Sequence, residues 1–419
     1  MARKRAALVS VLGRLVDCAQ VLFGAIATPG FWILQRLCPD RLARARHEPV
    51  AQRGASYLEH ASWIDKAIYL TRLSCTEGLL ARNEPSIHTT TTTGTGPEVI
   101  FVGDALATED LGDATFSPAL RARLMESDAL CINFEGIVGE TRSEIAPLFT
   151  ARGARQLARH ATRPNDEPDA GWCSAFDAAA ARSVLSLGRR LVVSMANNHT
   201  LDLGSAGFLR TEACLRAHGA LVAGAGEACT VLELGRVRIG FLALAYGSNR
   251  LVGRTPFASL SKLDDEAWLA ARRAELRECT HRVALLHWGH EYEWLPSGEQ
   301  RRLAERLIAH GFCAVMGHHP HVVQPHELRS GAWISYSLGD FVGGDRTPFS
   351  RLGVAVALRF HDDGSVSGTT VPLIQSPAWS RRTHVALLRE APRFERALAK
   401  RIQRRRGGIP VFGRMEARS

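Results

Sequence analysis

The sequence has no C-x-x-C pair, and its nine cysteines are scattered along the 419 residues. Disulfide frameworks and structural zinc sites usually show regularly spaced cysteine pairs. The sequence therefore predicts neither of them. Scattered, unpaired cysteines favour a reducing compartment, and we expect a cytoplasmic protein.

The sequence also lacks an uncharged apolar run of the length that a membrane span needs. A basic cluster at residues 3–5 precedes an apolar region that Arg14 and Asp17 interrupt. The uncharged stretch from 18 to 34 contains Pro29-Gly30 and is shorter than the roughly 20 residues of a spanning helix. We expect a buried or surface-lying helix here. The alternative is a membrane anchor at the N-terminus.

The sequence shows little excess of positive charge outside one segment, although the net charge of the chain is +10. Residues 381–419 hold 12 Lys/Arg against 3 Asp/Glu, a net of +9, so the rest of the chain is nearly neutral. A local basic segment indicates contact with an acidic partner or a membrane surface. The alternative is a solvated helix end, and nucleic-acid binding is not expected.

No G-x-G-x-x-G or G-K-[ST] motif is present, so Gly224 and Gly226 are not interpreted as a phosphate-binding loop. What is present is an alternation of short apolar runs with amphipathic stretches. This alternation indicates an α/β layered fold. The expected strands are Val99–Val102, Leu130–Ile132, Leu191–Met195, Arg238–Leu244, Val283–Leu286, Cys313–Met316 and Trp333–Ser337, and the expected helices are Ala175–Leu187, Ala206–His218, Asp264–Glu278 and Gly298–His310.

Composition divides the chain into four parts. Residues 1–88 are rich in Ala, Leu and Arg and predict a helical N-terminal extension. Residues 89–97 form a Thr- and Gly-rich linker. The catalytic domain is expected at 98–375, and a basic C-terminal tail at 376–419.

Residues that can bind metal follow the expected strands. In α/β sheets the carboxyl ends of strands are where catalytic groups gather. Eight of the 16 histidines lie between His281 and His326, and residues 317–321 read G-H-H-P-H. Imidazole with carboxylate is the usual ligand set for zinc, iron or manganese. The sequence therefore predicts a metal centre at the strand ends, whereas His281, His290, His310 and His326 are interpreted as structural.

Six motifs occur in a characteristic order: F-V-G-D (101–104), N-F-E (133–135), A-N-N-H-T-L-D-L-G (196–204), H-W-G-H-E-Y (287–292), G-H-H-P-H-V (317–322) and Y-S-L-G-D-F (336–341). In order and spacing they resemble the CapA family of poly-γ-glutamate capsule synthesis proteins. The resemblance covers roughly residues 98–345. CapA-like domains are similar to calcineurin-type metallophosphatases, which implies a two-sheet β-sandwich flanked by helices and a centre of two divalent metal ions.

The resemblance also implies roles for individual residues. Glu135 takes the place of a bridging aspartate, His319 and His321 contact different metals, and His199 donates a proton. Glu291 and Tyr292 line the pocket, although Tyr292 packing alone is an alternative. The implied metal ligands are Asp104, Glu135, Asn198, His287, His319 and His321.

The chain departs from the phosphatase pattern at three positions. Leu106 stands where the phosphatases carry a histidine, and Glu135 is one methylene longer than the usual aspartate. Asp340 replaces the asparagine of Y-S-L-G-N-F, and we expect it to cap a turn. The alternative is that it brings extra negative charge near the site. The first two departures, which CapA-like proteins share, put ordinary phosphatase activity in doubt.

The resemblance implies a metal-dependent hydrolase or transferase acting on an anionic polymer or a peptide, in capsule or poly-γ-glutamate biosynthesis. One alternative is a metal-dependent peptide epimerase in modified-peptide biosynthesis. Another is a non-catalytic, polymer-binding assembly subunit.

Overall fold

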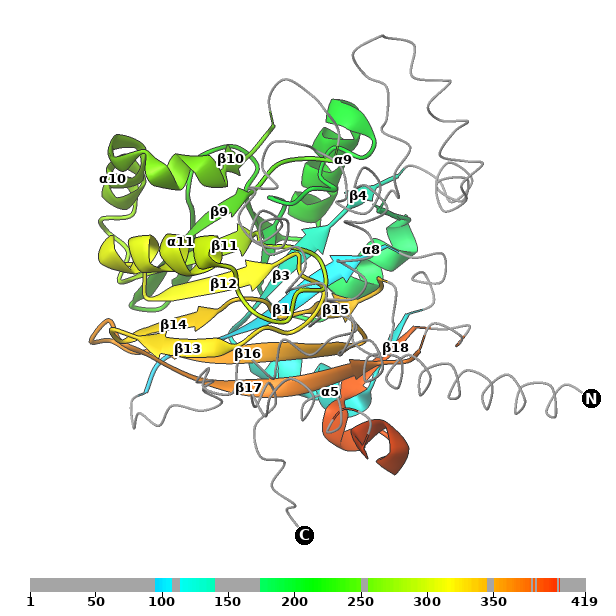
Figure 1. Cartoon of the computed structure of the whole chain (residues 1–419). Helices are drawn as coiled ribbons and strands as arrows, with labels where there is room; N and C mark the ends of the chain where they lie inside the picture. Colours follow the sequence, from blue (N-terminus) through cyan, green and yellow to red (C-terminus); the bar gives the residue numbers. More distant parts are fainter. Residues whose placement is uncertain are drawn as a thin grey trace, which may run out of the picture.

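The computed structural model describes residues 95–107, 114–139, 174–249, 255–344, 350–377, 380, 383–397 and 399. The expected N-terminal extension, most of the linker and the last 20 residues of the basic tail lie outside this part of the chain. The described residues form two β-sheets that face each other, with helices on both outer faces (Figure 1).

The larger sheet contains the first strand of the domain at its centre. Its order is β2-β18-β17-β16-β1-β3-β6-β7, and β15 also pairs with β1. β1, β3, β6 and β7 run parallel, whereas β16, β17 and β18 are antiparallel neighbours. The strands are β1 (Glu98–Leu106), β2 (Thr115–Phe116), β3 (Ala129–Glu135), β6 (Leu191–Ser194), β7 (Ala220–Ala223), β15 (Asp340–Val342), β16 (Leu352–Phe360), β17 (Val366–Gln375) and β18 (His384–Leu387).

The smaller sheet has the order β10-β9-β11-β12-β14-β13, with β8 paired to β9. Its central strands β9, β11, β12 and β14 are parallel. The strands are β8 (Thr230–Leu234), β9 (Val237–Ala245), β10 (Ala258–Ser259), β11 (His281–His287), β12 (Ala314–His318), β13 (His326–Arg329) and β14 (Ala332–Ser335). A short separate ladder joins β4 (Ile137–Val138) to β5 (Ala175–Phe176).

Alternation along the strands sorts side chains between the layers. In β1, Val99 and Phe101 point into the core between the two sheets, and Ile100 and Val102 point into the core under the helices of the larger sheet. Successive side chains of a strand lie on opposite faces, so a strand that is apolar throughout can be buried on both. In a fold of two sheets between two layers of helices, the central strands therefore have no face exposed to solvent.

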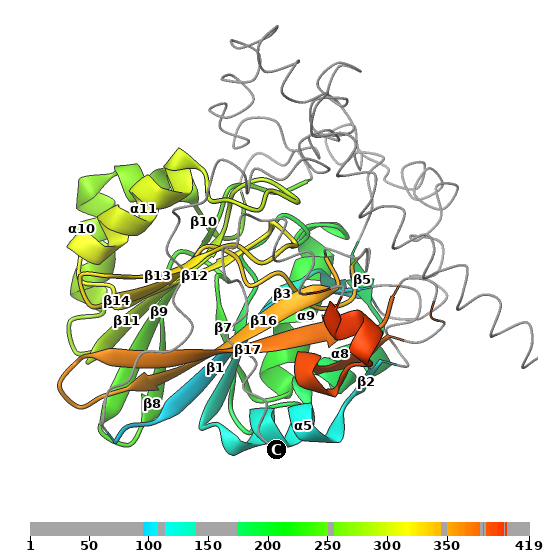
Figure 2. The same ribbon diagram turned by 60° about the horizontal axis from the view of Figure 1, so that its bottom comes forward.

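Helices cover both outer faces (Figure 2). On the larger sheet lie α5 (Pro118–Glu126), α8 (Ala178–Leu185) and α9 (Gly204–Ala217). On the smaller sheet lie η5 (Leu260–Asp264), α10 (Glu266–Glu275) and α11 (Gly298–Ala309). α11 begins with a capping box between Ser297 and Gln300 and buries Leu303 and Leu307 one turn apart. This arrangement confirms the expected two-sheet sandwich flanked by helices.

Each strand and helix expected between residues 99 and 337 has a counterpart. The expected helix at Ala175–Leu187 begins only at Ala178, because Ala175 and Phe176 pair with β4 and Asp177 caps the helix. The larger sheet continues past Gln375, where the sequence analysis placed the start of a basic tail. There β18 pairs with β17, and a short 3-10 turn, η6 (Leu388–Glu390), follows.

Among the helices that the structure describes, none combines the length and the apolar character that crossing a membrane requires.

Candidate metal centre

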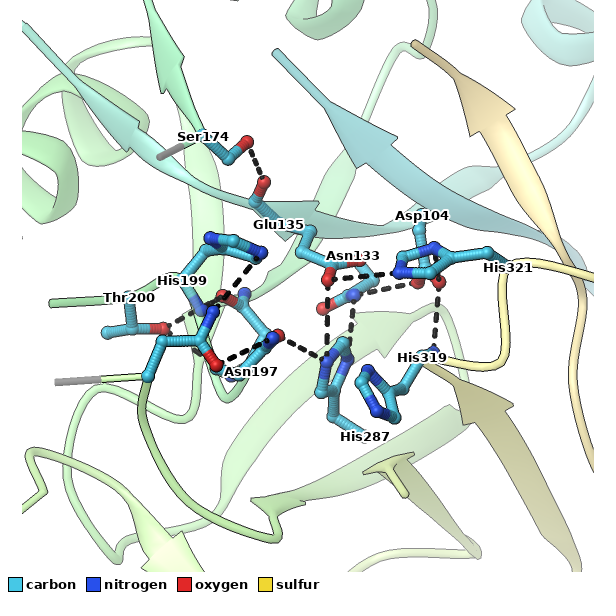
Figure 3. Close-up of polar contacts among 12 residues, drawn as sticks. Asp104, Asn133, Glu135, Ser174, Asn197, His199, Thr200, His287, His319 and His321 are labelled. Carbon is cyan, nitrogen blue, oxygen red and sulfur yellow. Dashed lines mark hydrogen bonds and ion pairs between the residues drawn. The ribbon is translucent and has the colours of Figure 1, made fainter. Parts of the chain in front are cut away.

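The carboxyl ends of parallel strands from both sheets meet at one edge of the sandwich. Glu135, His287 and His318 are the last residues of β3, β11 and β12. Asp104 lies earlier in β1, at an irregularity in its pairing with β3 and β15. Figure 3 shows side chains from both sheets converging at this edge.

Asp104 is fully buried and is held by one donor on each carboxylate oxygen. Its Oδ1 accepts a hydrogen bond from Asn133 Nδ2 at 2.8 Å, and its Oδ2 accepts one from the backbone N–H of His319 at 2.9 Å (Figure 3). The second bond joins β1 of the larger sheet to the loop after β12 of the smaller one. Asp104 therefore links the part of the site that the larger sheet provides to the part that the smaller sheet provides.

Glu135 is the central carboxylate and has no exposed surface. Its Oε1 lies 3.5 Å from His287 Nε2 and 3.8 Å from His321 Nε2. Neither carboxylate oxygen has a hydrogen-bond partner among the described residues. Burial, and secondarily the charge of Asp104, raise the pKa of Glu135 well above its usual value. A buried carboxylate without hydrogen bonds is costly, which indicates a site designed for a cation.

His287 is held on both ring nitrogens. Its Nε2 lies 2.8 Å from Asn198 Oδ1, and its Nδ1 lies 3.3 Å from Asn133 Nδ2. Burial, together with the neighbouring His319, lowers the pKa of His287 well below its usual value. The ring is therefore neutral near pH 7, as a metal ligand must be.

The G-H-H-P-H turn carries backbone strain. His319 and His321 have φ of 93° and 56°, and Tyr292, whose N–H donates to Pro320 O at 2.7 Å, has φ of 60°. Non-glycine residues adopt this left-handed region only when their surroundings impose it, and such residues cluster at functional sites. With these backbone conformations, the imidazoles of His319 and His321 both lie close to Glu135.

Asp340 corrects an expectation. The sequence favoured a turn cap, but Asp340 is the first residue of β15, is buried, and places Oδ1 2.9 Å from His321 Nδ1. β15 pairs with β1, and this pairing brings the carboxylate into the centre. Burial by itself lowers the pKa of His321, but Asp340 and Glu135 outweigh it and raise that pKa well above its usual value.

His199 lies on the other side of Glu135 from His321 (Figure 3). Its Nδ1 lies 2.7 Å from Asp202 Oδ2, which also accepts the N–H of Ser174 at 2.7 Å. A carboxylate only accepts, so we assign the proton of the neutral His199 ring to Nδ1 and the acceptor lone pair to Nε2. Asp202 therefore holds the ring of His199 in one orientation.

Glu291 and Tyr292 lie beside the cluster. The Tyr292 ring centroid is 5.9 Å from that of His321, and the charge of Glu291 contributes to the raised pKa of Glu135. Both side chains are partly exposed. They are therefore placed at the open side of the centre.

The donor set is of the kind that binds divalent cations. Three overlapping groups of donors each lie within 4.8 Å: Glu135 with His319 and His321, Asp104 with His321 and Asp340, and Asp104 with Glu135 and His287. Besides the Glu135 oxygens, His319 Nδ1 is buried and has no hydrogen-bond partner among the described residues. Carboxylate and imidazole together suit zinc, iron or manganese.

The sequence analysis missed three residues of the centre. Asn133 lies within the N-F-E motif and could have been found there. Asp340 was noticed but interpreted as a cap. Tyr246 follows β9, and its ring centroid lies 4.8 Å from that of His319 and 6.0 Å from that of His287. No pattern in the sequence marks Tyr246, because the contacts join separate strands.

Residues 98–345 match the family described as bacterial capsule synthesis protein PGA_cap. The chain belongs to this family. The matched range contains each of the six motifs and each of the side chains of the centre described above.

Two curated relatives are similar to parts of the chain. The PGA biosynthesis protein CapA of Bacillus subtilis (strain 168) is 30% identical over 172 residues, 38% of this chain and 45% of that protein. The capsule biosynthesis protein CapA of Bacillus anthracis is 30% identical over 196 residues, 43% of this chain and 47% of that protein. The matches thus span about half the length of these relatives. A solved structure described as a novel phosphatase from Mycoplasma pneumoniae is 11% identical, with a TM-score of 0.42 over 68% of this chain and 96% of that one.

Proposed function

We propose that this capsule-synthesis family member is a metal-dependent hydrolase or transferase that acts on an anionic polymer or a peptide. The observation that carries the proposal is Glu135, a fully buried carboxylate without hydrogen bonds, with Asp104 and three histidines around it. Buried polar side chains in a structural core normally have a hydrogen-bond partner.

The residues that would hold divalent metal are Asp104, Glu135, Asn198, His287, His319 and His321. A divalent cation bound there would act as a Lewis acid on a carbonyl or phosphoryl oxygen and would acidify a water molecule. Asn198 Oδ1 and His287 Nε2 lie 2.8 Å apart, which suits two ligands of one ion. Asn133, which contacts both Asp104 and His287, would hold those two ligands in place before an ion binds.

His199 is proposed to donate the proton that the leaving group needs. Asp202 holds Nδ1, so the proton is given from Nε2. The same carboxylate stabilises the charged ring before transfer. Because Asp202 also accepts from the Ser174 backbone, the pair has a fixed orientation.

The substrate class comes from the family. The two CapA relatives are named for capsule and PGA biosynthesis. An anionic polymer or a peptide is proposed here because the chain shares their family, and Glu291 and Tyr292 are proposed to contact it at the open side of the centre.

Metal analysis and turnover on one preparation test the proposal. Chain purified without chelator should contain at least one equivalent of Mn, Fe or Zn, and should cleave or transfer polyglutamate or peptide amides. Chelation should abolish this activity and metal should restore it. Full activity without metal would refute the proposal. Metal-dependent proton exchange at a peptide α-carbon without cleavage would indicate an epimerase, and polymer binding without turnover would indicate an assembly subunit.

A further inference from the structure

The turn after β9 contacts the centre at a residue that no motif includes. Asn249 N–H donates to Asn198 O at 2.9 Å, and Asn198 Nδ2 donates to Asn249 Oδ1 at 3.2 Å. Asn249 Nδ2 lies 3.4 Å from His199 Nε2. One amide side chain therefore touches both a proposed ligand and the proposed proton donor.

Once the donor and the acceptor of one of these hydrogen bonds are assigned, those of the others follow. The neutral ring of His199 carries its proton on Nδ1, facing Asp202, so Nε2 accepts from Asn249 Nδ2. The other end of the Asn249 amide is then an oxygen, which accepts from Asn198 Nδ2. This leaves Asn198 Oδ1 toward His287 Nε2, the direction that a metal ligand needs.

The turn is anchored independently of Asn249. The N–H of Tyr246 donates to His287 O at 3.1 Å, and the Tyr246 ring packs against His287 and His319. Ser248 Oγ lies 3.4 Å from Asn198 O. Loss of the Asn249 side chain would therefore leave the turn in place while removing the two side-chain contacts.

We propose that Asn249 is a positioning residue that orients two groups separately: its Oδ1 turns the Asn198 amide oxygen toward the metal, and its Nδ2 fixes the ring of His199. The inference rests on the proposed function of this centre. It goes beyond that function by assigning a role outside the six motifs.

Two substitutions separate the two contacts. Asn249→Ala removes both, and Asn249→Asp keeps an acceptor for Asn198 while removing the donor to His199. Loss of a group that orients a metal ligand costs about 10–100-fold in metal affinity or activity. We expect Asn249→Ala to lower Co²⁺ affinity and kcat by about this factor. Asn249→Asp should bind Co²⁺ at least as tightly as the unaltered chain, but should lower kcat.

The decisive measurement uses the full chain in metal-free form. Long-range ¹H–¹⁵N spectra report the protonation of each ring nitrogen of His199, and both substitutions should shift the Nε2 resonance. Ser261→Ala, which removes an exposed hydroxyl in η5, is the control and should change neither the spectrum nor Co²⁺ affinity.

The outcomes separate this inference from the proposed function. Unaltered Nε2 resonance and Co²⁺ affinity in Asn249→Ala would overturn the inference, and so would equal loss of Co²⁺ affinity in both variants. An unaltered chain that binds no Co²⁺ would overturn the proposed function, yet the His199 spectrum would still test the role of Asn249.

Discussion

Asp104 and Asp340 occupy paired positions on the neighbouring parallel strands β1 and β15, and both reach the same nitrogen of His321. Asp340 Oδ1 lies 2.9 Å and Asp104 Oδ2 lies 3.6 Å from His321 Nδ1. The shorter contact is a hydrogen bond that leaves Nε2 directed toward Glu135. Strand pairing, and not local sequence, sets the orientation of this imidazole.

Replacement of Asp340 should therefore weaken metal binding through His321. We expect Asp340→Ala to lower the affinity for Zn²⁺ or Mn²⁺ about 10–100-fold, the usual cost of losing the partner of a ligating histidine. Asp340→Asn should lose less, because its amide oxygen still accepts from Nδ1–H. Calorimetric titration measures both affinities. Glu327→Gln, at a buried carboxylate paired with Arg301 away from the centre, should leave them unchanged. Unchanged affinity in Asp340→Ala would contradict this role.

His287→Ala and His199→Ala should fail in different ways. Loss of His287, a proposed ligand, should lower metal content and activity together. Loss of His199 should leave metal bound but reduce the rate about 10²–10⁴-fold, the range for general acid–base catalysis. Metal stoichiometry and turnover are measured on the same folded preparations.

His326→Ala is the control for that pair. His326 is also fully buried, but its Nδ1 contacts Ser335 Oγ and not the centre. The His326→Ala variant should keep both its metal and its turnover. If His199→Ala loses metal as completely as His287→Ala, then His199 is a ligand and the role proposed for it is wrong.

Metal binding should release protons, and its affinity should rise with pH. The raised pKa values of Glu135 and His321 mean that the metal-free chain retains protons on these groups to higher pH than usual. Metal must displace these protons, so lowering the pH weakens binding. The lowered pKa values of His287 and His319 leave those rings neutral and add no such competition near pH 7.

Titration in two buffers of different ionisation enthalpy measures the protons released. Thermal stabilisation by a fixed metal concentration should also grow with pH, because it follows the affinity. Binding heat that is independent of the buffer would show that no net proton is displaced.

The last part of the basic segment should serve docking. Residues 401–419 contain six Arg and one Glu, a net of +5, and follow Glu395, which pairs with the buried Arg351. Deletion of 401–419 should keep the metal centre intact because Arg351 and β18 remain. It should weaken binding to polyglutamate or anionic vesicles, with a difference that shrinks as salt increases. Equal binding of both forms at low salt would refute a docking role.

Local pattern and motif order were sufficient to predict the alternating elements and the layered fold. Apolar runs mark β9, β11 and β12 clearly because both faces of these strands are buried. The motifs also contain the side chains that meet at the strand ends. The individual roles of Asp104, Glu135 and the histidines remain predictions that the experiments above test.

Other features depend on pairing that no local pattern encodes. The Gly-Asp sequence at 339–340 is typical of a turn, but pairing with β1 makes Asp340 a strand residue. Asn249 meets Asn198 across a separation of 51 residues. β16 was not predicted as a strand, although Leu352–Phe360 is an apolar run of the kind used for the other strands.

The central position of β1 has a consequence for the order of folding. β1 is synthesised first among the described strands, yet two of its partners, β15 and β16, begin more than 200 residues later. Contacts between such distant segments form slowly, since a long loop must close first. During synthesis on the ribosome, Asp104 cannot pair with Asp340 until β15 has emerged. The candidate metal centre is therefore incomplete until that point. We expect metal to enter after translation of the domain, with β3 as the first lasting neighbour of β1 and β6 pairing with β3.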